Sequence, residues 1–147
     1  MGCMMAQALA AKNCMNVLKF ADTNIIVYAV GKDSEHRKIA RQIIADGVAV
    51  SAQVINETIS VLTRKQGTSL AVAHEVAESL LDLCETIQVD AQTIRKAIEL
   101  VKHYQFSHWD SLIVAAALLA GCETLFSQDM QHGIVIDERL KIVNPFL

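Results

Sequence analysis

The stretch VLKFADTNIIVYAV, residues 17–30, decides how the rest of the chain is interpreted. Its first five residues form a short apolar run that stops at Asp22, which predicts a strand followed by a polar turn. The chain then stays apolar, without a breaker, until Gly31, which predicts a short helix. A strand that leads through one acidic residue into a helix is how a βαβ crossover begins.

The same alternation continues along the chain. Ser34, Ser51 and Asp90 each precede an apolar-faced segment as capping residues, and Gly47, Gly67 and Gly121 each follow one. This pattern predicts an α/β fold with three layers, in which helices flank a central, mostly parallel sheet of about five strands. The expected strands are 17–21, 48–50, 86–89, 123–127 and 140–143, and the later helices are 35–45, 52–65, 68–83, 91–103 and one within 106–121.

Composition supports one globular domain. Of the 147 residues, 52% are hydrophobic, only one is proline, and the formal net charge is −3. This composition excludes disordered and collagen-like chains, and it argues against a strongly basic nucleic-acid groove. Residues 15–147 are expected to form the domain, and residues 1–14 are expected to be an atypical extension, dispensable, disordered or not native.

No segment has the length of a membrane span or the pattern of a secretion signal, so we expect a cytoplasmic protein. The four cysteines show no CxxC pair and no zinc-finger spacing, which favours free thiols.

Four acidic residues lie in apolar or neutral stretches of sequence: Asp22, Glu57, Asp110 and Asp129. Each also has a structural explanation on its own. Asp22 could cap a helix, Glu57 could be exposed, Asp110 could lie in the first turn of a helix, and Asp129 could begin a turn. Together, two strand-end acids and two acids near helix starts can converge on one edge of a parallel sheet. Two such charges about 4 Å apart repel by roughly 4 kcal/mol at an effective dielectric of about 20, and a divalent cation removes that penalty. All-oxygen ligands suit Mg²⁺ or Mn²⁺, as in two-metal phosphodiester hydrolysis.

Four segments in this order resemble the PIN-domain ribonucleases, and among them the small VapC-type toxins of bacterial toxin–antitoxin pairs. The segments are ADTNIIVYA, SAQVINE, FSHWDSLIVAAA and LFSQDM, and the resemblance runs from about Met15 to Leu147.

The resemblance implies a metal-dependent endoribonuclease that cleaves single-stranded or looped RNA. Asp22, Glu57, Asp110 and Asp129 would hold one or two Mg²⁺ or Mn²⁺ ions, and Asn24 and Ser127 would support them. It also implies a homodimer and a cognate antitoxin that covers the acidic site. Setting the four acids aside changes the formal charge from −3 to +1, which is consistent with metal ions supplying the field that phosphate needs.

The other candidates are divided between two roles. The apolar residues after Asp22 would either pack in the core or line a groove for the antitoxin, and four basic residues would either contact RNA phosphates or form a solvated face. Histidines and a tryptophan near Asp110 suggest a general base or a base-stacking residue, but we expect the tryptophan to pack in the core. The apolar candidates are Ile26, Val27 and Val30, and the basic ones are Lys32, Arg37, Lys38 and Arg41. The candidates near Asp110 are His103, His108 and Trp109.

Two alternative functions remain. A catalytically silent PIN-like module that binds a partner protein is favoured if any of the four acids points away from the others. A receiver-like phosphoacceptor domain lacks the lysine expected after a late strand.

Overall fold

The computed structural model describes residues 19–32 and 34–147. The expected extension at residues 1–14 lies outside these residues, as does the start of the strand expected at 17–21. The elements in chain order are β1 (Lys19–Ala21), α2 (Thr23–Val30), α3 (Glu35–Ala45), β2 (Ala49–Ser51), α4 (Ala52–Arg64), α5 (Leu70–Leu83), β3 (Glu85–Ile87), α6 (Ala91–His103), α7 (His108–Leu119), β4 (Thr124–Phe126), β5 (Val135–Ile136) and β6 (Leu140–Val143).

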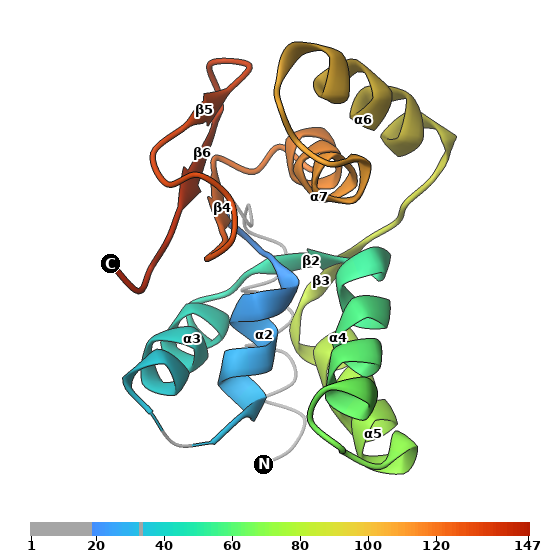
Figure 1. Ribbon diagram of the computed structural model, residues 1–147, viewed down its shortest axis with the longest axis vertical. Coiled ribbons are helices and arrows are strands. Elements are labelled where there is room, and N and C mark those ends of the chain that lie inside the picture. The colour runs from blue at the N-terminus through green and yellow to red at the C-terminus, as the bar shows by residue number, and fades with distance from the viewer. Residues whose placement is uncertain (1–18, 33) are drawn as a thin grey trace, which may run out of the picture.

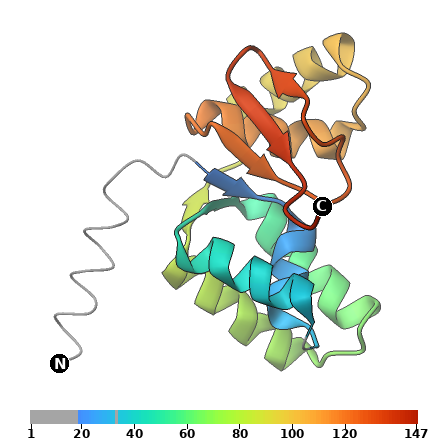
Figure 2. The same ribbon diagram turned by 90° about the vertical axis from the view of Figure 1, so that its left-hand side faces the viewer.

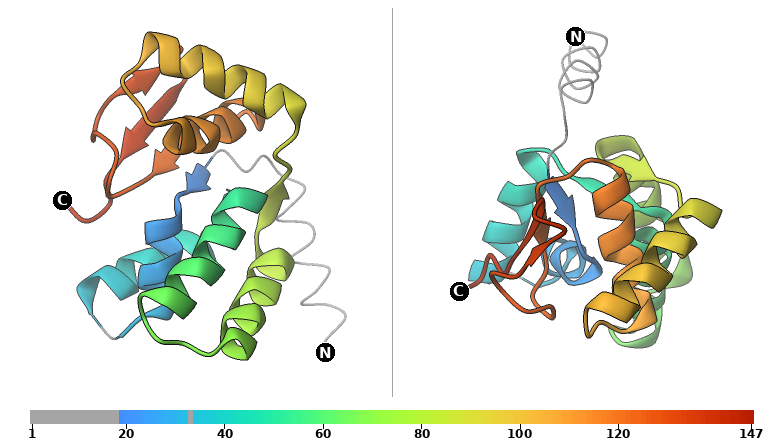
Figure 3. Two further views of the ribbon diagram at one scale, coloured as in Figure 1. Left: turned by 45° about the vertical axis from the view of Figure 1, so that its right-hand side comes forward. Right: turned by 90° about the horizontal axis from the view of Figure 1, so that it is seen from above.

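The strands form one sheet in the order β3-β2-β1-β4-β6-β5, in which only β5 runs antiparallel to its neighbour. Figure 2 shows β1, in blue, beside β4, with β6 and β5 beyond them. Seen from above, the sheet lies between α3 on one side and α6 and α7 on the other (Figure 3, right). The predicted three-layer fold with a mostly parallel sheet is confirmed. The sequence interpretation missed β5, which is only two residues long.

The helices begin where the sequence placed their caps. The hydroxyl oxygens of Ser34 and Ser51 each accept a hydrogen bond from the backbone N–H three residues later, both at 3.2 Å. Asp90 forms a reciprocal capping box with Thr93 at the start of α6. Caps depend on residues three positions apart, so they can be predicted without knowledge of the tertiary fold.

The sheet order indicates which edge of the sheet is suited to a binding site. The order in which strands are added changes side at β1, because β2 and β3 extend the sheet on one side of it and β4 to β6 extend it on the other (Figure 1). In open sheets of this kind, the crevice beyond the carboxyl ends of the strands beside such a change binds ligands. The carboxyl ends of β1 and β4 pair through Ala21 and Phe126, and the backbone N–H of Asp22 donates to the carbonyl oxygen of Phe126 at 2.9 Å.

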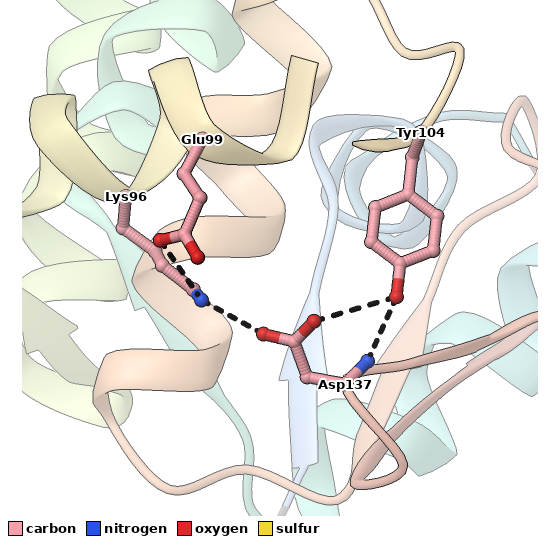
Figure 4. A network of polar contacts seen from close by, with 4 residues as sticks. All are labelled: Lys96, Glu99, Tyr104 and Asp137. Carbon is pink, nitrogen blue, oxygen red and sulfur yellow. Dashed lines mark hydrogen bonds and ion pairs between the residues drawn. The ribbon is translucent and has the colours of Figure 1, made fainter. Parts of the chain in front are cut away.

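A separate polar network fastens the β5–β6 hairpin to α6 (Figure 4). Lys96 Nζ lies 2.8 Å from Asp137 Oδ2 and 3.4 Å from Glu99 Oε2. The hydroxyl of Tyr104 donates to Asp137 Oδ1 and accepts from the backbone N–H of Asp137. Asp137 and Glu138 have φ angles of 49° and 58°, which this tight hairpin turn requires. We call this group the hairpin network.

The described helices include none that is long and apolar enough to cross a membrane.

Candidate active site

All four predicted acids line one cavity at the carboxyl end of the sheet. The cavity has a volume of about 860 Å³, and its wall includes Asp22 after β1, Glu57 in α4, Asp110 in α7 and Asp129 after β4. Asn24 also lines it. The structure therefore places the acids that the sequence interpretation selected on the wall of one cavity.

Asp22 is the buried member of this group, with 5% of its surface exposed. It caps α2, because its Oδ1 accepts from the backbone N–H of Thr23 at 2.7 Å, while its Oδ2 accepts from the hydroxyl of Ser127 at 2.8 Å. Burial raises the pKa of Asp22 to about 6, against these two hydrogen bonds, and the charges of Asp110 and Glu57 raise it further. The carboxyl is thus held in place at an electrostatic cost, and the described residues include no cation paired with it.

Asn24 and Ser127 connect Asp22 with Asp129. The Asn24 amide nitrogen donates to Asp129 Oδ2 at 3.2 Å and lies 3.5 Å from Asp22 Oδ2, and its oxygen accepts from the backbone N–H of Gln128 at 3.2 Å. Ser127 is fully buried behind Asp22 and does not reach the cavity wall. Both residues hold the carboxylates from the positions in which the sequence placed supporting residues.

Both oxygens of Glu57 are engaged by neutral donors that the sequence interpretation missed. The hydroxyl of Thr23 donates to Glu57 Oε2 at 2.6 Å, and the amide of Gln53 donates to Glu57 Oε1 at 2.7 Å. Gln53 precedes Glu57 by one helical turn, a spacing at which side chains meet and which could have identified it. Thr23 has no such signal, because 34 positions separate it from its partner.

Asp110 lies in the first turn of α7, whose N-cap is Ser107. Partial burial raises the pKa of Asp110 despite a hydrogen bond with Ser107, and the charges of Glu57 and Asp129 raise it further. Each of these carboxylates therefore opposes the ionisation of another.

Cations do not neutralise this group within the described part of the chain. Lys32 and Lys65 line the cavity, but the described residues include no ion pair to any of the four acids. The described His, Cys, Asp and Glu side chains also do not form a ready-made group of three that could hold a metal ion. The cavity is thus an acidic wall whose hydrogen bonds come from hydroxyl, amide and backbone N–H donors.

The remaining apolar and basic candidates lie in different places, some in the core, some on the cavity wall and some on the surface. Ile26 is buried in the core, Val27 lines the cavity, and Val30 lies on the surface with 38% exposed. Of the four basic candidates only Lys32 reaches the cavity wall, while Lys38 pairs with Glu35 on the surface. Arg41 donates to the backbone oxygen of Ala29.

The expectation that Trp109 packs in the core is wrong. Its side chain is 65% exposed, and His103 and His108 are exposed as well. The N-cap Ser107 and the first two residues of α7, 108 and 109, are all exposed, whereas residues 111–118 are all buried. Trp109 is adjacent to the apolar run in sequence, but it precedes the part of the helix that is packed in the core. None of these three side chains lines the cavity.

Comparisons with known proteins agree with this fold. Residues 19–133 match the family model of the PIN domain. Among solved structures, the chain is similar to the toxin VapC20 of Mycobacterium tuberculosis, with a TM-score of 0.63 and 23% identity over 76% of this chain and 89% of that one. It is also similar to a toxin–antitoxin complex from Klebsiella pneumoniae, with a TM-score of 0.64 and 19% identity over 86% of this chain and 97% of that one. VapBC2 of Rickettsia felis gives a TM-score of 0.64 and 19% identity over 86% and 98% of the two chains. No curated protein matches the sequence.

Proposed function

The chain belongs to the PIN-domain family, and from that premise we propose that it is a metal-dependent endoribonuclease and the toxin of a toxin–antitoxin pair. The observation that carries the proposal is the set of four carboxylates on one cavity wall, whose hydrogen-bond partners among the described residues are all neutral. A cavity that needed these acids only for folding would gain from a paired lysine or arginine. Carboxylates without a basic partner, by contrast, keep their charge available to attract and bind a cation.

The residues fit a hard divalent cation such as Mg²⁺ or Mn²⁺. Asp22, Glu57, Asp110 and Asp129 supply only oxygen ligands, which is the donor set that these ions prefer. The absence of a ready-made group of three among the described residues is consistent with Mg²⁺, which usually takes one or two carboxylates and completes its shell with water and substrate phosphates. When bound, such an ion supplies Lewis-acid activation of water and stabilises charge on the leaving oxygen.

The protein's own groups hold this arrangement rigid. Ser127 and the N–H of Thr23 fix Asp22, while Asn24 fixes Asp129 and the Thr23 hydroxyl fixes Glu57. Fixing charged groups in advance avoids reorganisation during the reaction. Lys32 and Lys65 on the cavity wall are placed to attract the phosphates of RNA.

A partner protein is the second part of the proposal. The Klebsiella and Rickettsia structures are described as a toxin–antitoxin complex and as VapBC2 bound to promoter DNA. In this chain, an apolar pocket of about 270 Å³ lies between α2, α3 and α5, and Val30, Ile44 and Leu83 are part of its wall. An antitoxin helix docked in this pocket would contact α2, the helix that also contributes residues to the wall of the acidic cavity. We further propose a homodimer, and a cytoplasmic location, where the RNA substrate is found.

The test is cleavage of structured and single-stranded RNA by the purified chain, with Mg²⁺ or Mn²⁺ and with chelator. We expect cleavage that depends on the metal, and sequencing of the RNA ends would then identify the target. Cleavage that survives chelation contradicts the metal-dependent mechanism. No cleavage with either ion supports the alternative of a catalytically silent interaction module.

The antitoxin is tested separately, by co-purification from the native source and by adding the products of neighbouring genes to the cleavage assay. We expect one small protein that copurifies and inhibits. Recovery of the homo-oligomer alone, with cleavage unaffected by neighbouring proteins, contradicts the toxin–antitoxin assignment and leaves the nuclease assignment standing.

A further inference from the structure

Trp109 is exposed in a way that the fold does not explain. It lies on α7, where residues 111–118 are all buried, yet its own side chain is 65% exposed. Apart from Leu147 at the chain end, it is the most exposed large apolar side chain among the described residues. Indole rings carry a large apolar surface that is usually packed against protein, so Trp109 contributes little of that stabilisation to this fold.

The backbone of Trp109 is tied to the acidic cavity. One amide nitrogen of Gln53 donates to the carbonyl oxygen of Trp109 at 3.1 Å and to Glu57 Oε1 at 2.7 Å. The next residue, Asp110, lines the cavity itself. Trp109 therefore lies just outside the cavity, connected through a single side chain to one carboxylate and through the backbone to another.

The orientation of the indole ring is restrained as well. The ring of His108 meets it edge to face, with centroids 5.4 Å apart and planes at 72°. An exposed ring held by its neighbour loses less conformational entropy on binding than a freely rotating one, which favours a role in recognition.

We propose that Trp109 is a platform on which an unpaired base of the RNA substrate stacks beside the acidic cavity. This inference rests on the proposed function. The four carboxylates repel phosphate and the chain as a whole has a formal charge of −3, so a contribution that does not depend on positive charge would add to the attraction from Lys32, Lys65 and a bound cation. Stacking of a base on an aromatic ring is such a contribution. In a duplex both faces of each base are already stacked, so the platform selects single-stranded or looped RNA.

The test exploits the fact that Trp109 is the only tryptophan in the chain. In stopped-flow mixing with single-stranded RNA and Mg²⁺, the intrinsic fluorescence should be quenched before cleavage begins, and duplex RNA should leave it unchanged. A Trp109→Phe/Leu81→Trp variant moves the tryptophan to an exposed position on α5, where it should give no quench. Equal quenching by duplex RNA, or quenching at the new position, overturns the proposal.

Steady-state kinetics give the second readout. Trp109→Ala should raise KM for single-stranded RNA about 10-fold, with kcat within about 2-fold of the parent, and Trp109→Phe should recover most of the loss. Leu81→Ala, which also removes an exposed apolar side chain, is the matched control and should change neither constant. An unchanged KM for Trp109→Ala in an enzyme that cleaves RNA overturns the stacking role but not the nuclease. A sedimentation coefficient of Trp109→Ala that differs from the parent's also overturns the stacking role, because Trp109 would then belong to a contact between two copies of the chain. A parent that binds single-stranded RNA with quenching but never cleaves it contradicts the nuclease alone.

Discussion

The acidic cavity and the hairpin network both contain carboxylates joined to partners far away in the sequence, but they treat charge in opposite ways. In the hairpin network, Asp137 faces Lys96, whose hydrogen bond lowers the pKa of Asp137 below its usual value. In the cavity, burial raises the pKa of Asp22 to about 6, and its neighbours Asp110 and Glu57 add to the effect.

Under the proposed function, this difference separates acids that fasten the fold from acids that would receive a cation. A carboxylate that already has a cation partner, as in Asp137, fastens two elements together and needs nothing else. A carboxylate held by hydroxyl and amide donors keeps its charge available for a bound cation. Pairs of titratable groups whose surroundings shift their pKa values are candidate functional sites, and the direction of the shift distinguishes the two groups here.

The largest expected effect comes from removing one charge in the cavity. Asp22→Asn and Asp110→Asn should each lower cleavage by roughly 1,000-fold, because a metal ion accounts for several kcal/mol of transition-state stabilisation. Stability without metal should stay the same or rise, since asparagine keeps the shape and relieves repulsion. Cleavage assays and melting curves with and without Mg²⁺ measure both effects. If either variant cleaves normally, or if Mg²⁺ stabilises it as much as the parent, the acid concerned is not a metal ligand.

The next effect is the pH dependence of stability, measured in chelator so that no metal ion is bound. The pKa of Asp22 is raised from 3.8 to about 6, so the folded state binds this proton more tightly than the unfolded state does. Protonated Asp22 therefore adds about 3 kcal/mol to the free energy of unfolding. This contribution is complete below pH 3.8 and is lost as the pH rises through 6.

Urea unfolding between pH 4 and 7.5 measures this loss. Asp22→Asn should remove the component due to Asp22 and leave a shallower decline, because the pKa of Asp110 is raised as well. A parent whose metal-free stability increased over this pH range would show that Asp22 is not the uncompensated group described here.

The smallest effect is expected at the hairpin network. Lys96→Met should lower the free energy of unfolding by about 1 kcal/mol, because the ion pair with Asp137 is partly exposed and screened by solvent. Cleavage should stay within about 2-fold of the parent, and urea unfolding and RNA assays on one preparation measure both. A large loss of cleavage would mean that the two acidic groups are coupled and that the comparison between them fails.

The sequence predicted what local patterns control. Helix α3 was predicted with its bounds and its cap, because Ser34 and the apolar face of the helix are all within a few turns of each other. The convergence of Asp22 and Asp129 was also predictable, since residues that follow parallel strands meet at one edge of the sheet.

The rest depends on contacts between distant residues. No local pattern connects Thr23 with Glu57, or Lys96 with Asp137, whose partners lie 34 and 41 positions away. The exposure of Trp109 was missed because the sequence shows that an apolar run begins nearby, but not where the packed part of α7 starts. The strand β5 is too short to show an alternating pattern, and its pairing with β6 is what defines it.

The pairing of β1 with β4 has a consequence for the order in which the protein becomes complete during synthesis. Asp22 depends on Ser127, and Asn24 on Asp129, across 105 positions in each case. A growing chain, extended at about 5–20 residues per second, therefore carries Asp22 and Glu57 for several seconds before the opposite wall of the cavity exists. Until residues beyond 126 have left the ribosome, the central strand lacks one neighbour and the acidic wall lacks a member. The nascent chain therefore cannot complete the cavity before residues 127–129 have left the ribosome, however early Asp22 and Glu57 emerge.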